Sequence, residues 1–143
     1  MKSESADQKL LASLIKSFVT PAPDKQVFMI EDKSGGQEIG ICGLFEIDTM
    51  TKVALVKFLP IRQKLGMGDH YVDAMSTISA HAFGTLGLER LFINVPADNL
   101  FITSVLIRCG AQKIEPEYTF KAQDSGPFDS YVVRKVDWES NGH

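Results

Sequence analysis

The 143-residue sequence predicts an α+β fold built on a mixed, mostly antiparallel sheet. Three consecutive runs rich in branched and aromatic residues, separated by turns, indicate an antiparallel meander over residues 26–59. A long helical pattern then joins the third run to a fourth, and a strand–helix–strand connection of this kind places its two strands parallel. The chain length suits one domain, residues 1–143.

The first half of the chain begins with a helical pattern. Apolar residues at helical spacing predict a helix over residues 6–19, which the prolines that follow would stop. Strands are then predicted over residues 26–31, 37–48 and 52–59, with a two-glycine turn between the first two.

The second half alternates helices and strands. Apolar positions every three to four residues predict a long amphipathic helix over residues 69–86 and a short helix over residues 99–108. Between them, residues 90–95 read as a strand that lies parallel to the third one. Two further strands are predicted over residues 112–121 and 129–136, and the final WESNGH is expected to fray.

The composition excludes several classes of function. The net charge is −3 and no block of Lys and Arg stands out, so neither a nucleic-acid surface nor an anionic membrane surface is predicted. No apolar run is long enough to span a bilayer, and the start lacks the features of a signal peptide, so a cytoplasmic protein is expected. Cys42 and Cys109 share no metal-like spacing; we expect reduced, buried thiols, with a disulfide between them as the alternative, and no metal.

The loop IRQKLGMGDH, residues 61–70, stands between an apolar strand and an apolar helix. Gln63, Gly66 and Gly68 form the pattern Q-x-x-G-x-G, in which the glycines permit close approach of a ligand to the backbone. The unpaired N–H groups and the dipole of a helix start favour an anion, so a phosphate cradle is one interpretation and a plain turn is the other. Neither a G-x-G-x-x-G fingerprint nor a Walker A loop is present here.

The segment FLPIRQKLGMG resembles motif A of the GNAT N-acetyltransferase superfamily, in which a strand leads through Q/R-x-x-G-x-G/A into a long helix. Downstream, VPADN and LIRCGAQKI look like the family's next strand, its Asn and the end of its last helix. The match covers residues 26–136 and also resembles the branch that acetylates protein N-termini and similar amines. It implies a GNAT-like sheet whose central parallel strand pair splays around a CoA cleft.

The resemblance implies acetyl-CoA as a cosubstrate and assigns residues to it by position. The pantetheine arm would pair with Phe58 and Leu59 at the end of the third strand. Asn99 matches the family's Asn, which often bonds the pantetheine, and a helix cap is the alternative role for its side chain. The diphosphate would take backbone N–H groups from Gln63, Lys64, Leu65, Gly66, Met67, Gly68 and Asp69.

The implied reaction is direct attack of a primary amine on the thioester while both substrates are bound. A general base would take the ammonium proton. The chain departs from the family at two positions. Leu106 stands where many relatives carry a Tyr that acts as the general acid for the thiolate, and no Glu is present at the start of the motif A strand to act as the base. The remaining candidates for catalytic roles are Glu46, Asp48 and Ser104.

The chain also departs from the family at its start, because only one predicted helix precedes the first strand. This shortened N-terminal region leaves the acceptor pocket open, reduced, or completed by a second subunit. Two functions are therefore kept. The first is an N-acetyltransferase acting on a small amine or a peptide N-terminus, with a homodimer as a family expectation. The second is a CoA-binding or degenerate GNAT module that acts as a sensor or interaction partner without catalysis.

Overall fold

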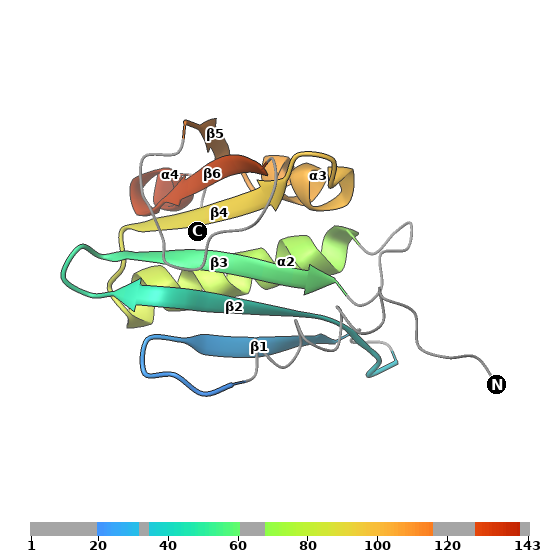
Figure 1. Ribbon diagram of the computed structural model, residues 1–143, viewed down its shortest axis with the longest axis horizontal. Coiled ribbons are helices and arrows are strands. Elements are labelled where there is room, and N and C mark those ends of the chain that lie inside the picture. Colours follow the sequence, from blue (N-terminus) through green and yellow to red (C-terminus); the bar gives the residue numbers. More distant parts are fainter. Residues whose placement is uncertain (1–19, 32–34, 61–67, 116–127, 141–143) are drawn as a thin grey trace.

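The computed structural model describes residues 20–31, 35–60, 68–115 and 128–140. Within them, six strands form one sheet in the order β1-β2-β3-β4-β6-β5, with β1 at one edge and β5 at the other (Figure 1). The strands are β1 (Gln26–Glu31), β2 (Glu38–Asp48), β3 (Val53–Pro60), β4 (Arg90–Pro96), β5 (Gln112–Ile114) and β6 (Phe128–Arg134). The predicted helix over residues 6–19 lies outside the described residues.

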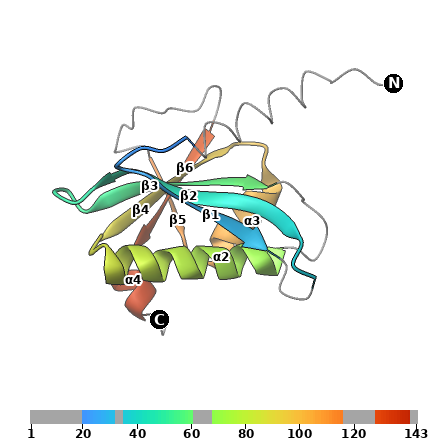
Figure 2. The ribbon, with the colours of Figure 1, turned by 90° about the horizontal axis from the view of Figure 1, so that it is seen from below.

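Two of the described helices, over residues 68–80 and 100–108, stand where the sequence predicted them, and a third follows the last strand. They are α2 (Gly68–Ala80), α3 (Leu100–Arg108) and α4 (Lys135–Ser140), and a π-helical turn η1 (His81–Thr85) extends α2. Figure 2 shows all of them on one side of the sheet. In the part of the chain that the structure describes, no helix is long and apolar enough to cross a membrane.

The sheet has the predicted mixture of directions. β3 and β4 run parallel, because α2 carries the chain back along the sheet between them. The other neighbours run antiparallel: β1 with β2, β2 with β3, β4 with β6, and β5 with β6. The α+β fold class with a central parallel pair is confirmed.

The parallel pairing ends halfway along the two central strands. It joins Val53–Val56 to Arg90–Ile93 and goes no further, although both strands continue. Beyond that point β3 stays paired with β2, up to Gly40 opposite Pro60. β4 stays paired with β6, up to Pro96 opposite Phe128. Each central strand therefore follows its antiparallel neighbour, and the carboxyl ends of β3 and β4 separate.

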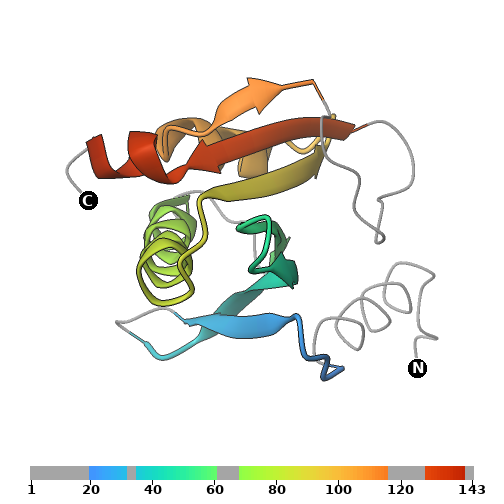
Figure 3. The same ribbon diagram turned by 90° about the vertical axis from the view of Figure 1, so that its left-hand side faces the viewer.

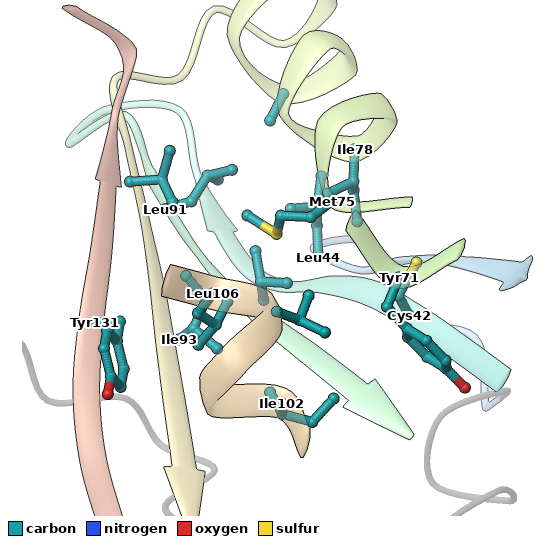
Figure 4. Close-up of a cluster of buried hydrophobic side chains, with 14 of the residues drawn as sticks. Cys42, Leu44, Tyr71, Met75, Ile78, Leu91, Ile93, Ile102, Leu106 and Tyr131 are labelled. Carbon is teal, nitrogen blue, oxygen red and sulfur yellow. The ribbon is translucent and has the colours of Figure 1, made fainter. Parts of the chain in front are cut away.

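The larger core lies between the sheet and the helices. Tyr71, Met75 and Ile78 come from one face of α2. Figure 4 shows side chains of α2, α3, β2, β4 and β6 meeting there. A second cluster lies on the other face of the sheet and consists of Ile41, Phe45, Val53, Leu55, Leu59, Phe92 and Val132.

One aromatic side chain fixes the start of α2 against the sheet. The Tyr71 ring is fully buried, and its hydroxyl donates a hydrogen bond of 2.6 Å to the carbonyl oxygen of Ile39. The rings of Phe58 and Phe101 meet it edge-on, at centroid distances of 6.2 and 5.2 Å. A Cβ atom added at Gly40 would lie 2.4 Å from the Tyr71 hydroxyl, so this contact requires glycine.

The C-terminal part differs from the prediction in two places. The predicted strand over residues 129–136 ends at Arg134, and residues of the WESNGH segment that was expected to fray belong to α4. The physical reason is the Trp138 ring, which is half-buried and packs on Phe83 at a centroid distance of 5.6 Å. The predicted strand over residues 112–121 is β5 over its first three residues, and residues 116–121 lie outside the described part.

We expect Gly40→Ala to lower the free energy of unfolding by about 1–3 kcal/mol, because the added methyl group collides with the Tyr71 hydroxyl in a packed core. Urea unfolding measures the change. Gly84→Ala is the matched control, since a Cβ there meets no atom within 4 Å; it should change stability by less than about 0.5 kcal/mol. Equal effects of Gly40→Ala in the wild type and in a Tyr71→Phe background would contradict the assignment.

Because the Cys42 thiol is buried, we expect the folded protein to lose stability at high pH. Burial raises the pKa of Cys42 from 9.0 to about 12, so above pH 9 the unfolded chain loses a proton that the native chain keeps. The free energy of unfolding should therefore fall as the pH rises from 9 towards 11. Burial raises the pKa of Tyr71 to about 12 and adds to the fall above pH 10. Urea titrations at each pH should give a shallower fall for Cys42→Ala, and parallel curves would contradict this origin.

Candidate functional site

The candidate site begins where α2 follows the separated end of β3. Gly68, Asp69 and His70 form the first turn of α2, and the backbone N–H groups of such a turn have no partner within the helix. Together with the helix dipole they favour an anion, although the dipole by itself contributes only about 0.3–1 kcal/mol at an exposed position. The other predicted cradle residues, Gln63, Lys64, Leu65, Gly66 and Met67, lie outside the described residues.

The structure adds a cation to this helix start. The Arg108 side chain, from the last turn of α3, donates a hydrogen bond to the Asp69 carboxylate and forms an ion pair with it. This hydrogen bond and the charge of Arg108 lower the pKa of Asp69. A Cβ atom at Gly68 would lie 3.0 Å from Arg108 Nη1, so the glycine leaves room for the guanidinium beside the backbone.

Sequence reasoning missed Arg108 as a site residue. Its position in the last turn of α3 reads as an ordinary favourable contact with the helix dipole. Arg108 and Asp69 are 39 residues apart in the sequence, and only the packing of α3 beside α2 brings them together. No short-range pattern carries that information.

A cavity of about 390 Å³ continues from Arg108 along α2. Its polar lining includes Asp73, Ser76 and Ser79 from successive turns of α2, and Trp138 of α4 closes another side. The Ser79 side chain is buried, and its hydroxyl makes no hydrogen bond to any residue that the structure describes. A buried hydroxyl in this state offers a donor and an acceptor to a ligand.

Phe58 and Leu59 lie on the part of β3 that has left β4. Both are paired with β2, opposite Cys42 and Ile41, and neither is in register with a residue of β4. Successive residues of a strand direct their backbone groups to alternate sides, so one of the two presents its N–H and C=O to the gap. The side chain of Phe58 faces Tyr71, whereas that of Leu59 belongs to the cluster on the other face.

Asn99 caps α3. Its Oδ1 accepts a hydrogen bond of 3.1 Å from the backbone N–H of Ile102. The capping alternative of the sequence analysis is therefore present in the structure. The bond uses only the oxygen of the amide, and a contact of the Nδ2 group with a cofactor remains a prediction.

Glu46 and Asp48, the two carboxylates among the catalytic candidates, lie near the hairpin that joins β2 to β3. Asp48 Oδ1 accepts hydrogen bonds from the backbone N–H groups of Thr51 and Met50, and these bonds lower the pKa of its carboxyl. Asp48 pairs with Val53, five residues before Phe58, which corresponds to about 17 Å along the strand. Glu46 is half-buried at the irregularity in the β2–β3 pairing and has a φ of 50°.

The third catalytic candidate lies on the outer surface of α3. The Ser104 hydroxyl is exposed and donates a hydrogen bond of 2.8 Å to the carbonyl oxygen of Phe101. Leu106, which stands at the position of the family's Tyr, is fully buried in the larger core. The catalytic roles of Glu46, Asp48 and Ser104 remain predictions.

Neither cysteine of the chain takes part in a disulfide. Cys42 and Cys109 are free thiols, and burial raises the pKa of Cys109 to about 11, so both thiols are neutral near pH 7. Among the described residues, no group of three or more His, Cys, Asp or Glu side chains could hold a metal ion.

Comparison with known proteins gives a match only at the level of structure. No family model matches the sequence, and no curated protein matches it. The spermidine N-acetyltransferase SpeG from Vibrio cholerae, in a mutant form, superimposes with a TM-score of 0.68 at 16% identity, over 95% of this chain and 80% of that chain. A second mutant form, described as a spermidine/spermine N-acetyltransferase, gives 0.67 at 15% identity, over 95% and 81%.

A different acetyltransferase structure from Vibrio cholerae, provisionally described as acting on a ribosomal-protein serine, superimposes with a TM-score of 0.65. It is 17% identical, over 90% of this chain and 73% of that chain. These likenesses confirm the fold that the QKLGMG motif and the order of elements predicted. The chain has the fold of the GNAT acetyltransferases.

Proposed function

We propose that this protein is an N-acetyltransferase that moves an acetyl group from acetyl-CoA to a primary amine, with both substrates bound together. The observation that carries the proposal is the separation of β3 from β4 beyond Val56, on the strand that precedes α2 in the chain. The separated strands leave backbone groups of β3 unpaired with β4, and the helix start adds an anion site beside them. The GNAT fold supports the same reading.

The described residues fit the parts of acetyl-CoA. The first turn of α2 and Arg108 would hold the diphosphate, and the glycines of QKLGMG would permit its close approach. The cavity along α2 would take the nucleoside end, with the Ser79 hydroxyl as a hydrogen-bond partner and Trp138 as an apolar wall. The backbone of Phe58 and Leu59, together with Asn99, would hold the pantetheine.

The cofactor supplies an acetyl group that is already activated as a thioester. The chain holds both reactants in one orientation, which replaces a bimolecular encounter by an effectively intramolecular step. An N–H group of β3 that faces the gap would stabilise the oxygen that becomes negative during the attack. A carboxylate would take the ammonium proton. Glu46 suits this role better than Asp48, whose lowered pKa makes it the weaker base and whose oxygen holds a turn.

The acceptor is proposed only as a class. Structural neighbours are described as acting on spermidine and spermine, and one on a ribosomal protein. A small polyamine and a peptide N-terminus are therefore the first amines to test. Leu106 has no hydroxyl that could act as the general acid at this position. This favours the second candidate function, a CoA-binding module without turnover. We assign the protein to the cytoplasm for either function.

We expect acetyl-CoA to bind with a micromolar Kd in titration calorimetry. Gly66→Ala/Gly68→Ala should weaken this binding tenfold or more, because a methyl group at Gly68 meets Arg108 and crowds the helix start. Arg108→Ala should weaken binding by about tenfold and reduce its dependence on salt, through loss of one charge-assisted contact. Gly84→Ala, at an open position, is the matched control. Unchanged affinity in Arg108→Ala would exclude Arg108 as a phosphate ligand.

We expect release of the CoA thiol when the protein, acetyl-CoA and an amine are mixed, with spermidine and peptides bearing free N-termini as the first panel. Glu46→Gln should lower kcat by about 100-fold or more and leave the Kd for acetyl-CoA unchanged, because only the proton transfer is lost. Asp48→Asn is the comparison variant and should retain most of the activity. Tight binding of acetyl-CoA without thiol release for any amine would favour the binding module.

A further inference from the structure

The acceptor amine of the proposed reaction has to reach the separated ends of β3 and β4. The groups proposed to hold acetyl-CoA are the start of α2, Arg108 and the cavity along α2, and they lie with the helices on one side of the sheet. Figure 3 shows α2 on one side of both central strands. Because both reactants are bound together, we expect the amine to approach from the opposite face of the sheet.

Lys57 is the first residue of β3 beyond its parallel pairing with β4, which ends at Val56. The side chains of Leu55 and Leu59 belong to the cluster on the face opposite the helices. Since side chains alternate along a strand, Lys57 is directed to that same face. It therefore stands beside the gap between the central strands, on the side from which the amine would come.

An aromatic ring holds the Lys57 ammonium group. Its Nζ lies 5.3 Å from the centroid of the Phe45 ring, and Lys25 Nζ lies 5.6 Å from the same centroid. A Cβ atom added at Gly43 would come within 2.8 Å of this ring. Lys57 is half-buried and forms no ion pair with a described residue. The ring contact leaves N–H donors of the ammonium for an anionic group.

Asn94 occupies the corresponding position on β4, as the first residue beyond its pairing with β3. Phe92 belongs to the cluster opposite the helices, so Asn94 faces that side as well. The hydroxyl of Ser130, on β6, is buried and donates a hydrogen bond of 2.8 Å to Asn94 Oδ1. This bond orients the amide. Its Nδ2 group makes no hydrogen bond within the described part of the chain and offers two donors.

The side chains on the two sides of the gap thus present donors and a positive charge. A carboxylate accepts hydrogen bonds only, and its bonds to an ammonium are charge-assisted, so it matches both Lys57 and Asn94. A second ammonium group, as in a polyamine, would be repelled by Lys57. We infer that the amine bound at this site also bears a carboxylate, which Lys57 and Asn94 hold while its nitrogen reaches the gap.

This inference rests on the proposed function and names the class of amine that the same site would take. A free α-amino acid supplies the required chemistry, and so does a peptide whose first residue is acidic. In both, a few bonds separate the amine from the carboxylate. The two sources share one mode of recognition, and suitable ligands distinguish them.

Titration calorimetry of the full chain, with and without saturating CoA, measures binding in the absence of turnover. L-phenylalanine with phenethylamine, and L-lysine with cadaverine, are matched pairs that differ only in the α-carboxylate. We expect the carboxylate-bearing member of a pair to bind about tenfold tighter or more. The amides of Asp-Ala and Asn-Ala test the peptide source, because they differ only in a side-chain carboxylate.

Four variants test the residues. Lys57→Met should abolish the preference for the carboxylate, because it keeps an apolar stem over the ring and removes the charge. Lys57→Arg should keep the preference. Asn94→Asp should reverse it, since the new carboxylate still accepts the bond from Ser130 and repels a second carboxylate. Lys113→Met, which removes a positive charge on the edge strand β5, is the matched control and should leave the preference unchanged.

Equal affinities within every pair would overturn the inference, and so would a lack of measurable binding by every carboxylate-bearing member. A preference that survives both Lys57→Met and Asn94→Asp would also overturn it, because the carboxylate would then be held elsewhere. Circular dichroism melts show whether each variant is folded. If a variant unfolds, the comparison of pairs on the wild-type chain still decides.

Thiol release from acetyl-CoA separates this inference from the proposed function. Carboxylate-dependent binding without thiol release for any member would contradict acetyl transfer and support the amine site. Thiol release at equal rates and affinities for both members of every pair would support acetyl transfer and overturn the inference.

Discussion

The hydrogen bond from the Tyr71 hydroxyl to the Ile39 carbonyl determines where α2 begins relative to the sheet. Tyr71 lies in the first turn of this helix, and its ring fills the space between Phe58 at the end of β3 and Phe101 of α3. One buried side chain therefore connects three elements around the gap between the central strands. The requirement for glycine at position 40 is the steric consequence of this contact.

The gap itself arises from competition between strand pairings. β3 has an antiparallel partner along its whole length, and so does β4, whereas their mutual parallel contact covers only four residues. Antiparallel pairing is slightly more stable per residue than parallel pairing. Where the twist of the sheet forces neighbouring strands apart, the parallel pair β3–β4 therefore separates and the antiparallel pairs stay intact. The cleft proposed for acetyl-CoA is in this sense a product of topology. The side chains around it then determine which ligand is held.

The electrostatics of the helix start depend on two residues that neutralise each other. Asp69 would repel a diphosphate, but its carboxylate is engaged by Arg108, which brings a cation to the same place. Both side chains are largely exposed, so the pair contributes little to stability, and its importance lies in the field near the helix start. The same packing of α3 on α2 forms the cavity that contains the Ser79 hydroxyl.

The sequence by itself determined the order of most elements, the parallel central pair and the GNAT-like motif, because periodicity, glycines and prolines act over a few residues. It also indicated Asn99 as a cap, since a cap is a local contact. Only the tertiary structure decided the pairing of Arg108 with Asp69, the contact of Tyr71 with Gly40 and the helical state of residues 135–140. Each of these depends on groups that lie far apart in the chain, and no local pattern encodes which distant groups will meet.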